Sequence, residues 1–319
     1  MIVSRCPVRI SVAGGSTDLE SFISKHGRGA VVSFSANIYT YITVFRDRFG
    51  QNTVEDKYNI VWSRTENVTY PSKIRNDIAR VAITDMSSGP LHCWFTADVS
   101  STGSGLASSS SHMVALVSAL NNLEGHNLTK PQIISRAWTL EKRFNPLTGF
   151  QDPWGVASGG LNLHEKKFNE DVISTALDSS IFKKFKMYLL PSNFNRSSTT
   201  VLEKVKDTVD TDLLKAVEDM RFAIITRDKK MFMDVVKWGW DLKKNSSSMI
   251  LGNQGLIDLD AKLEKSDYIL AHRLLGAGNG GYFLLFTDLN TSQKKIEKDF
   301  STTVLPVSID YNGINTLRM

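Results

Sequence analysis

The chain of 319 residues contains only two cysteines, Cys6 and Cys93. Neither belongs to a CxxC motif or to a Cys/His spacing typical of a metal site. A cysteine-based metal centre is therefore excluded. We expect two buried, reduced thiols, as in a cytoplasmic protein, although the sequence alone leaves a disulfide between them open.

Long apolar runs are also missing. No apolar stretch approaches the roughly 18 residues of a membrane-spanning helix, so we expect no membrane partner. Arg5 and Arg9 interrupt the first fifteen residues. These residues therefore lack the apolar core of a signal peptide, and we expect a cytoplasmic location.

The charges form no block of one sign. The net charge is +5, and lysines and arginines are scattered in small groups, unlike the basic tails that bind nucleic acid. We therefore expect no nucleic-acid partner. A mild positive excess does favour small anionic ligands at a cleft. The oligomeric state stays open, with a homodimer as one expectation.

Hydrophobic residues make up 41% and charged residues 22% of the chain, which is typical of globular domains. Strand-like and helix-like segments occur without regular βαβ alternation, which predicts an α+β fold. The sequence becomes richer in helix near residues 165–195, which favours two packed lobes, 1–165 and 166–319.

We expect strands at 2–13, 31–45, 58–63, 91–99, 161–165, 186–190, 282–286 and 304–309. We expect helices at 19–26, 73–86, 130–144 and 291–300, from 108 onward and within 199–265.

The most informative segment reads GSGLASSSS from Gly103 to Ser111 and opens a predicted helix. Free N–H groups at a helix start, approached past small side chains, bind phosphate well. The segment is not a Walker loop, because no lysine occurs between Lys73 and Lys130. It is not a dinucleotide fingerprint either, because Ser108 breaks the glycine spacing. The alternative is a flexible linker.

Two further glycine-rich segments flank it in the chain. Pro7–Asp18 reads as a strand that ends in a double-glycine turn and presents Asp18. The alternative for Asp18 is an N-cap of the next helix. Gly276–Gly281, GAGNGG, precedes an apolar strand, and its alternative is a tight connection between a helix and that strand.

In this order, the three segments resemble the motifs of the GHMP kinases, PxRxxxxGGGTD, PxxxGLGSSAA and a GxGxGG-like loop. The resemblance implies a two-lobed α+β fold with the nucleotide/sugar cleft between an N-terminal and a C-terminal lobe. It also implies phosphoryl transfer from ATP with Mg²⁺. The GGSTD turn and the pair Gln151-Asp152 most resemble the D-glycero-D-manno-heptose 7-phosphate kinases. That branch implies phosphorylation of the C1 hydroxyl of a sugar phosphate, on the route to a nucleotide-activated heptose.

The same resemblance implies roles for individual residues. Asp152 would be the general base and Arg9 would stabilise charge on the transferred group. Glu141 and Ser109 would be Mg²⁺ ligands. Substrate binding is implied for Gly15, Ser16, Thr17, Asp18 and Arg196, and ATP binding for Gly103, Ser104, Gly105, Leu106, Ala107, Ser108, Ser109, Ser110 and Gly278.

Each role has a plainer alternative. Asp152 could hydrogen-bond its own loop, and Glu141 could pair with Arg143. Arg196 and Arg273 are weaker candidates for contacts with the substrate phosphate or with ATP, and Arg273 stands where related sequences carry lysine. We expect both to be surface residues.

The chain also departs from the family pattern. Ala107 stands where the family has glycine and Ser101 where it has proline, so a Cβ at 107 would crowd a phosphate if φ is positive there. Pro153 and Trp154 alter the floor of the sugar site and leave the acceptor open. A kinase for a free sugar such as fucose, or a homologue that binds nucleotide or sugar without catalysis, are the competing functions.

Overall fold

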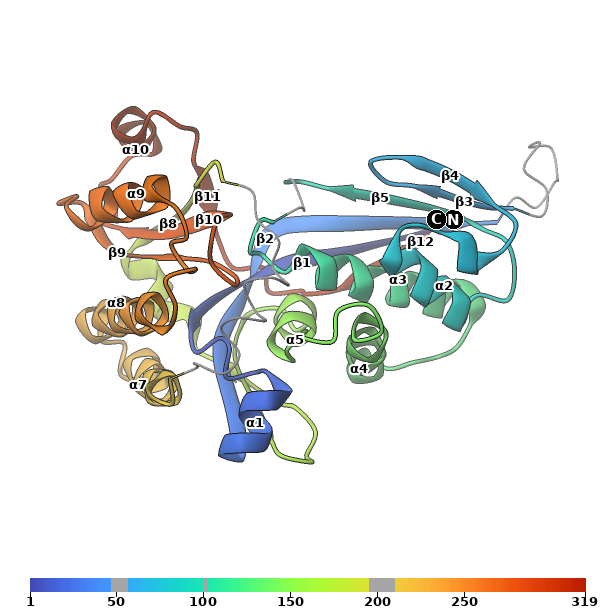
Figure 1. Cartoon of the computed structure of the whole chain (residues 1–319), viewed down its shortest axis with the longest axis horizontal. Helices are drawn as coiled ribbons and strands as arrows, with labels where there is room; N and C mark the ends of the chain where they lie inside the picture. Colours follow the sequence, from blue (N-terminus) through green and yellow to red (C-terminus); the bar gives the residue numbers. More distant parts are fainter. Residues whose placement is uncertain (47–56, 100–102, 195–209) are drawn as a thin grey trace.

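The computed structural model describes residues 1–46, 57–99, 103–194 and 210–319, which form two lobes built around two separate sheets (Figure 1). Helices and antiparallel strands are mixed in both lobes. The prediction of an α+β fold is therefore confirmed.

The first lobe contains an eight-stranded sheet. Its main path runs in the order β12-β1-β2-β5-β3-β4, and β6 and β7 extend it from β2. Among the strands of the described residues, only β3 and β5 pair in parallel. The strands are β1 (Ile2–Ala13), β2 (Arg28–Phe45), β3 (Tyr58–Val61), β4 (Thr65–Val68), β5 (His92–Ala97), β6 (Leu161–Lys167), β7 (Ile173–Leu177) and β12 (Asn315–Arg318).

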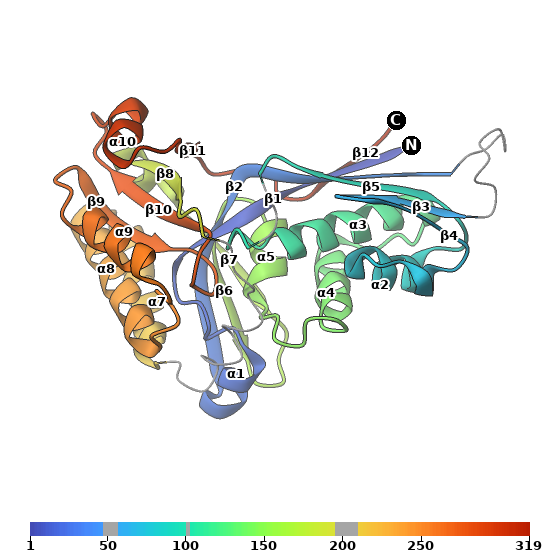
Figure 2. The same cartoon turned by 45° about the horizontal axis from the view of Figure 1, so that its top comes forward.

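Helices cover one face of this sheet (Figure 2). The central one, α3 (Ser108–Glu124), is buried along most of its length and contacts β1 and β2. α4 (Lys130–Glu141) starts with Pro131 and a capping box between Thr129 and Gln132, as its sequence predicts. The others are α1 (Glu20–His26), α2 (Asp77–Met86) after the 3-10 turn η1 (Pro71–Lys73), and α5 (Gln151–Ala157).

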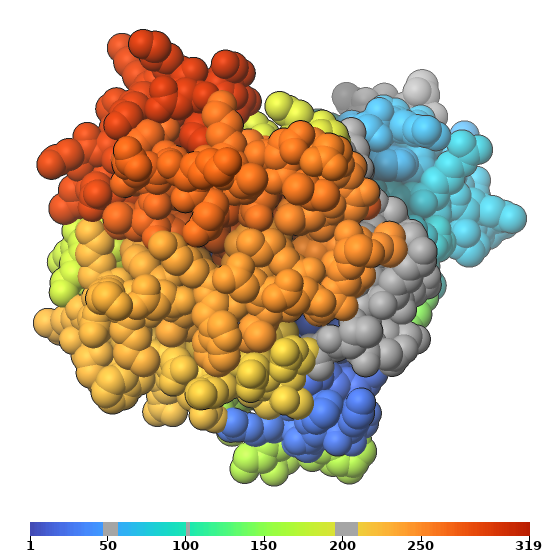
Figure 3. Space-filling model, turned by 60° about the vertical axis from the view of Figure 1, so that its left-hand side comes forward, coloured from blue at the N-terminus to red at the C-terminus, as the bar shows by residue number. Residues whose placement is uncertain are grey.

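The second lobe contains a four-stranded sheet in the order β11-β8-β10-β9. Its helices form the outer surface in Figure 3, with the N-terminal segment around α1 (blue) below them. The elements are β8 (Lys186–Pro191), β9 (Ile269–Leu274), β10 (Tyr282–Thr287), β11 (Leu305–Val307), η2 (Ser179–Lys184), α7 (Asp212–Thr226), α8 (Lys229–Ser246), α9 (Gln254–Glu264) and α10 (Gln293–Phe300).

The two lobes share a hydrophobic core. Val8 and Phe34 of the first sheet belong to one buried cluster with Met220 of α7, Phe232 of α8 and Leu284 of β10. Because close-packed interiors resist sliding, this cluster sets the position of one lobe against the other.

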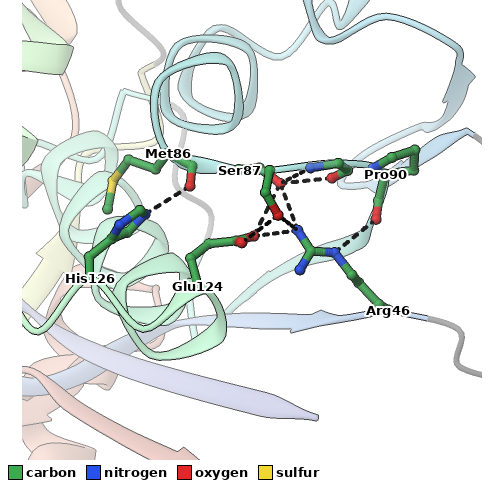
Figure 4. A network of polar contacts seen from close by, with 8 residues as sticks. Arg46, Met86, Ser87, Pro90, Glu124 and His126 are labelled. Atoms are coloured by element: carbon green, nitrogen blue, oxygen red, sulfur yellow. Dashed lines mark hydrogen bonds and ion pairs between the residues drawn. The ribbon is translucent and has the colours of Figure 1, made fainter.

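A polar network closes the far end of the first lobe (Figure 4). Arg46, just after β2, donates to a carboxylate oxygen of Glu124 at the end of α3 and to the Pro90 carbonyl, 3.3 Å away. Ser88 donates to the other Glu124 oxygen at 2.8 Å. The network therefore ties the loop after α2 to both the sheet and α3.

The sequence missed several strands. β4, β7, β9 and β12 were not predicted, and segment 31–45 is a single strand that begins at Arg28. The missed β4 and β12 are four residues long, too short for alternation to be visible. The lobe division at residue 165 stays a prediction, and the later strands β7 and β12 pair within the first sheet.

Cys6 and Cys93 are both buried and free, as expected. Burial raises the pKa of Cys6 to about 12, so its thiol is inert at neutral pH. In the part of the chain that the structure describes, no helix is long and apolar enough to cross a membrane.

Phe232 tests the shared core. Its ring lies 5.3 Å from that of Phe185 and 5.5 Å from that of Phe286, measured between centroids. Phe232→Ala should lower the free energy of unfolding by about 3–5 kcal/mol, because it leaves a cavity. Phe222→Ala on the neighbouring helix, where the side chain is 58% exposed, should change it by less than ~0.5 kcal/mol. Chemical denaturation of both variants provides the measurement, and equal losses would contradict a shared core.

Candidate active site

The three glycine-rich loops line one cavity. Gly15 and Ser16 come from the loop after β1, and Gly276 and Ala277 from the loop between β9 and β10. The loop before α3 and the first turn of that helix contribute Gly103, Ser104, Gly105, Ala107, Ser108 and Ser109. Segments more than 260 residues apart, at 15 and 276, thus face the same space. The alternatives of a linker and of a plain tight connection do not account for this convergence.

The second and third loops touch through their backbones. Gly281 has φ +96°, and a Cβ on it would lie 2.5 Å from the Ser104 carbonyl oxygen. Only glycine permits this approach. The contact holds the third loop against the loop that opens α3.

The start of α3 has no side-chain cap. The N-cap residue is Ala107, in the left-handed region with φ 60° and ψ 36°. Ser109 in the first turn is exposed and lines the cavity. The first N–H groups of a long helix therefore lie at the cavity with no capping side chain, an arrangement that suits an anion.

Arg9 and Asp152 form an ion pair in the cavity. The Arg9 Nη2 atom lies 2.7 Å from Asp152 Oδ1, and Nε donates to the same oxygen at 2.9 Å. Nη1 of Arg9 donates to the Gly105 carbonyl at 2.8 Å. Arg9 thus connects β1, the second glycine loop and α5. Asp152 is bound to this arginine rather than to the backbone of its own loop.

Asp18 is buried beside this pair. Its Oδ2 accepts a hydrogen bond from the Gln151 N–H at 3.4 Å, and Oδ1 has no partner among the described residues. The N-cap of α1 is Leu19, so the capping interpretation of Asp18 is wrong. Burial, with a further contribution from the Asp152 charge, raises the pKa of Asp18 to about 7.

Glu141 is buried at the end of α4. Ser110 donates to its Oε2 at 2.6 Å, while Arg143 pairs with Asp85 instead, so the Arg143 alternative for Glu141 is wrong. Burial raises the pKa of Glu141 to about 7, against the opposing effect of the Ser110 and Ser109 hydroxyls. Within residues 1–46, 57–99, 103–194 and 210–319, no three His, Cys, Asp or Glu side chains gather as a metal cluster.

Not every predicted site residue lines the cavity. The Thr17 hydroxyl donates to the Ala30 carbonyl at 2.7 Å, and Leu106 belongs to the shared core. Ser110 contacts Glu141, and Gly278 packs against Ile250. Arg196 lies outside the described residues.

The sequence missed several cavity residues. The cavity residues from Asn145 to Gln151 could have been predicted, because they lie in the chain between the predicted site residues Glu141 and Asp152. Arg273, predicted as a surface residue, is only 2% exposed, so that prediction is wrong. The cavity residues that the sequence analysis did not name are Leu19, Asn145, Leu147, Thr148, Gly149 and Lys243.

Comparison with known proteins agrees with this arrangement. The sequence profile described as the GHMP kinases N terminal domain matches residues 76–160. Residues 76–160 are thus a GHMP kinase N-terminal domain. A relative, the D-glycero-alpha-D-manno-heptose 7-phosphate kinase of Campylobacter jejuni, is 23% identical over 311 residues, covering 90% of this chain and 89% of its own.

Solved structures extend the likeness to the whole GHMP fold. A D-glycero-D-manno-heptose 1-phosphate kinase from Bacteroides thetaiotaomicron is 17% identical, covers 100% of this chain and 99% of its own, and has a TM-score of 0.78. The galactokinase of Lactococcus lactis, solved with galactose, is 13% identical, covers 100% of this chain and 95% of its own, and has a TM-score of 0.75. The two-lobed fold predicted from the motifs is therefore confirmed.

The backbone is strained at two motif positions. Ser16 and Ala107 stand where the family motifs carry glycine, and both have positive φ, 62° and 60°. A side chain in this region costs roughly 1–2 kcal/mol. Because φ is positive at Ala107, its Cβ would crowd a phosphate bound at this loop.

Replacing Ala107 by glycine tests this strain. Ala107→Gly should raise the free energy of unfolding by about 1 kcal/mol, because glycine adopts φ 60° without a Cβ clash. Ala115→Gly, in the interior of the same helix, should instead lower it by at least ~1 kcal/mol. Denaturant unfolding of the two variants distinguishes them, and a loss of stability in both would show that Ala107 is unstrained.

The raised pKa of Asp18 predicts a pH dependence. The pKa of Asp18 in the folded protein, about 7, exceeds the ordinary aspartate value of 3.8. The stability that Asp18 contributes is therefore complete below pH 3.8 and is lost as the pH rises to about 7. Asp18→Asn should therefore be more stable than the parent at pH 8, by an amount on the order of a few kcal/mol, and should approach it at pH 5. The exposed control Asp171→Asn should shift stability equally at both pH values, as followed by urea unfolding. A pH-independent effect of Asp18→Asn would contradict the shift.

Proposed function

We propose that this sugar kinase transfers the terminal phosphoryl group of ATP to the C1 hydroxyl of D-glycero-D-manno-heptose 7-phosphate. The main support is the convergence of three glycine-rich loops, the Arg9–Asp152 pair and Glu141 on one cavity. The relatives named above as heptose phosphate kinases support the choice of acceptor. The product would be a C1 phosphate, the form that is activated with a nucleotide.

The loop before α3 would bind the phosphates of ATP. The first N–H groups of the helix are uncapped by a side chain, and the helix dipole adds positive potential there. Ser104 and Ser108, whose hydroxyls lie 3.1 Å apart, line the same wall of the cavity. They would add hydroxyl donors to the backbone groups.

Asp152 would accept the proton of the C1 hydroxyl as it attacks the phosphorus. A carboxylate within reach of the hydroxyl speeds this step by general-base catalysis. Arg9, bound to Asp152 and to the Gly105 carbonyl, spans the acceptor side and the nucleotide loop. It would fix the carboxylate and stabilise charge on the transferred group. Asp18, with one oxygen free of partners among the described residues, would bind sugar hydroxyls.

Glu141 and Ser109 would hold Mg²⁺. Both line the cavity and provide hard oxygen ligands, and this ion usually takes only a few ligands from the protein. The buried Glu141 carboxyl, whose pKa is raised to about 7, would become fully ionised beside a divalent cation. When bound, the ion would neutralise charge on the phosphate oxygens.

A kinase for a free sugar is the second candidate. The structural likeness to a galactokinase solved with galactose supports it, and Pro153 and Trp154 distinguish the α5 segment from the family pattern. This candidate predicts turnover of an unphosphorylated hexose in preference to the heptose phosphate.

ADP release from ATP, Mg²⁺ and D-glycero-D-manno-heptose 7-phosphate tests the proposal. Asp152→Asn should lower kcat by about 10²–10⁴-fold, because the proton acceptor is lost. The surface control Asp171→Asn should keep the parent rate. Turnover of galactose or fucose alone would favour the second candidate. Equal rates in Asp152→Asn and the parent would remove Asp152 from the chemistry.

A further inference from the structure

Arg273 is a buried cation in the wall of the cavity. It is part of β9, three residues before the third glycine loop, and only 2% of it is exposed. Its Nη1 donates to the Val12 carbonyl at 2.8 Å. That carbonyl belongs to the end of β1, so the side chain reaches from the second lobe to the first.

No carboxylate in the described part of the chain forms an ion pair with Arg273. Its Nε is buried with no hydrogen-bond partner there. The contrast with Arg9 is direct, because Arg9 has Asp152 at 2.7 Å. Burying a charged group without a counter-charge is unfavourable, and arginines retained in such positions commonly bind a planar or tetrahedral anion.

The electrostatics of the site agree. Burial, together with the nearby positive charge of Arg9, lowers the pKa of Arg273 to about 10. Arg273 stays protonated at neutral pH even so. An anion would remove both penalties, since it would supply the missing acceptor and would screen one guanidinium from the other.

The position of Arg273 favours the acceptor over the nucleotide. The nucleotide loop already provides the uncapped start of α3 as its anion site. Arg273 is instead bound to Val12, two residues before the Gly14–Asp18 loop that carries Asp18. Lys243 of α8, which lines the cavity and donates to the Gly276 carbonyl, adds positive potential on the side of the second lobe.

We propose that Arg273 is the specificity residue that binds the phosphate monoester of the acceptor sugar. This inference rests on the proposed function, because it takes the acceptor to be a sugar phosphate. The buried guanidinium of Arg273, which joins β9 to the end of β1, would then distinguish phosphorylated sugars from free sugars.

Kinetics of Arg273→Gln and Arg273→Lys test the proposal. Arg273→Gln should raise the KM for heptose 7-phosphate by about 10–100-fold, the range expected for hydrogen bonds to a charged group. The KM for ATP should stay within about 3-fold of the parent value, well below that range. Arg273→Lys should recover most of the loss, because it restores the charge. A rise in the KM for ATP alone would assign Arg273 to the nucleotide and overturn the inference.

A binding measurement separates this inference from the proposed function. Thermal unfolding is followed with inorganic phosphate against chloride at equal ionic strength, with saturating ADP present to occupy the loop before α3. Phosphate should raise the Tm of the parent and of Arg273→Lys. The rise in the Tm of Arg273→Gln should be much smaller. This result would support the anion site even if the heptose phosphate were not turned over.

Two outcomes would overturn the anion site. One is an equal phosphate shift in Arg273→Gln and the parent. The other is the absence of any phosphate-induced rise in the Tm of the parent protein. This second outcome can be observed even if Arg273→Gln fails to fold. Turnover of the heptose phosphate with an unchanged KM in Arg273→Gln would reject Arg273 while leaving the proposed function intact.

Discussion

The ion pair between Arg9 and Asp152 is the interaction on which the site depends. A guanidinium buried on β1 must find acceptors, and it takes them from α5 and from the Gly105 carbonyl. Arg9 is buried while Asp152 is partly exposed, so loss of Asp152 would leave a buried guanidinium without its counter-charge, which is unfavourable. Three elements distant in sequence are therefore held at one point, with a carboxylate directed at the space where an acceptor would lie.

The shared core supplies the second constraint. α7 and α8 pack against β1 and β2 as well as against the second sheet, so the third glycine loop reaches the first lobe at a defined place. Gly281 and Ser104 then meet through their backbones. The cavity is thus a consequence of lobe packing, and its walls come from both lobes.

The site is built at some cost to stability. Two non-glycine residues, Ser16 and Ala107, adopt positive φ, and burial raises the pKa of Asp18 and Glu141 to about 7. Strained backbone and buried carboxyls tend to cluster at functional sites. Their presence around one cavity is consistent with a functional site there.

The sequence by itself determined the α+β class and the order of the glycine-rich loops, because turns and helix starts are local signals. Arg9, Glu141 and Asp152 were implied by the resemblance of the motifs to those of the GHMP kinases, and their roles stay predictions. Burial and long-range partners were decided only by the tertiary structure. Whether Asp18 would cap a helix or lie buried, whether Thr17 would face a ligand or the Ala30 carbonyl, and whether Arg273 would be exposed all depended on which distant segments packed beside them. Short strands such as β12 were equally invisible, since they gain their stability from pairing with β1 rather than from their own residues.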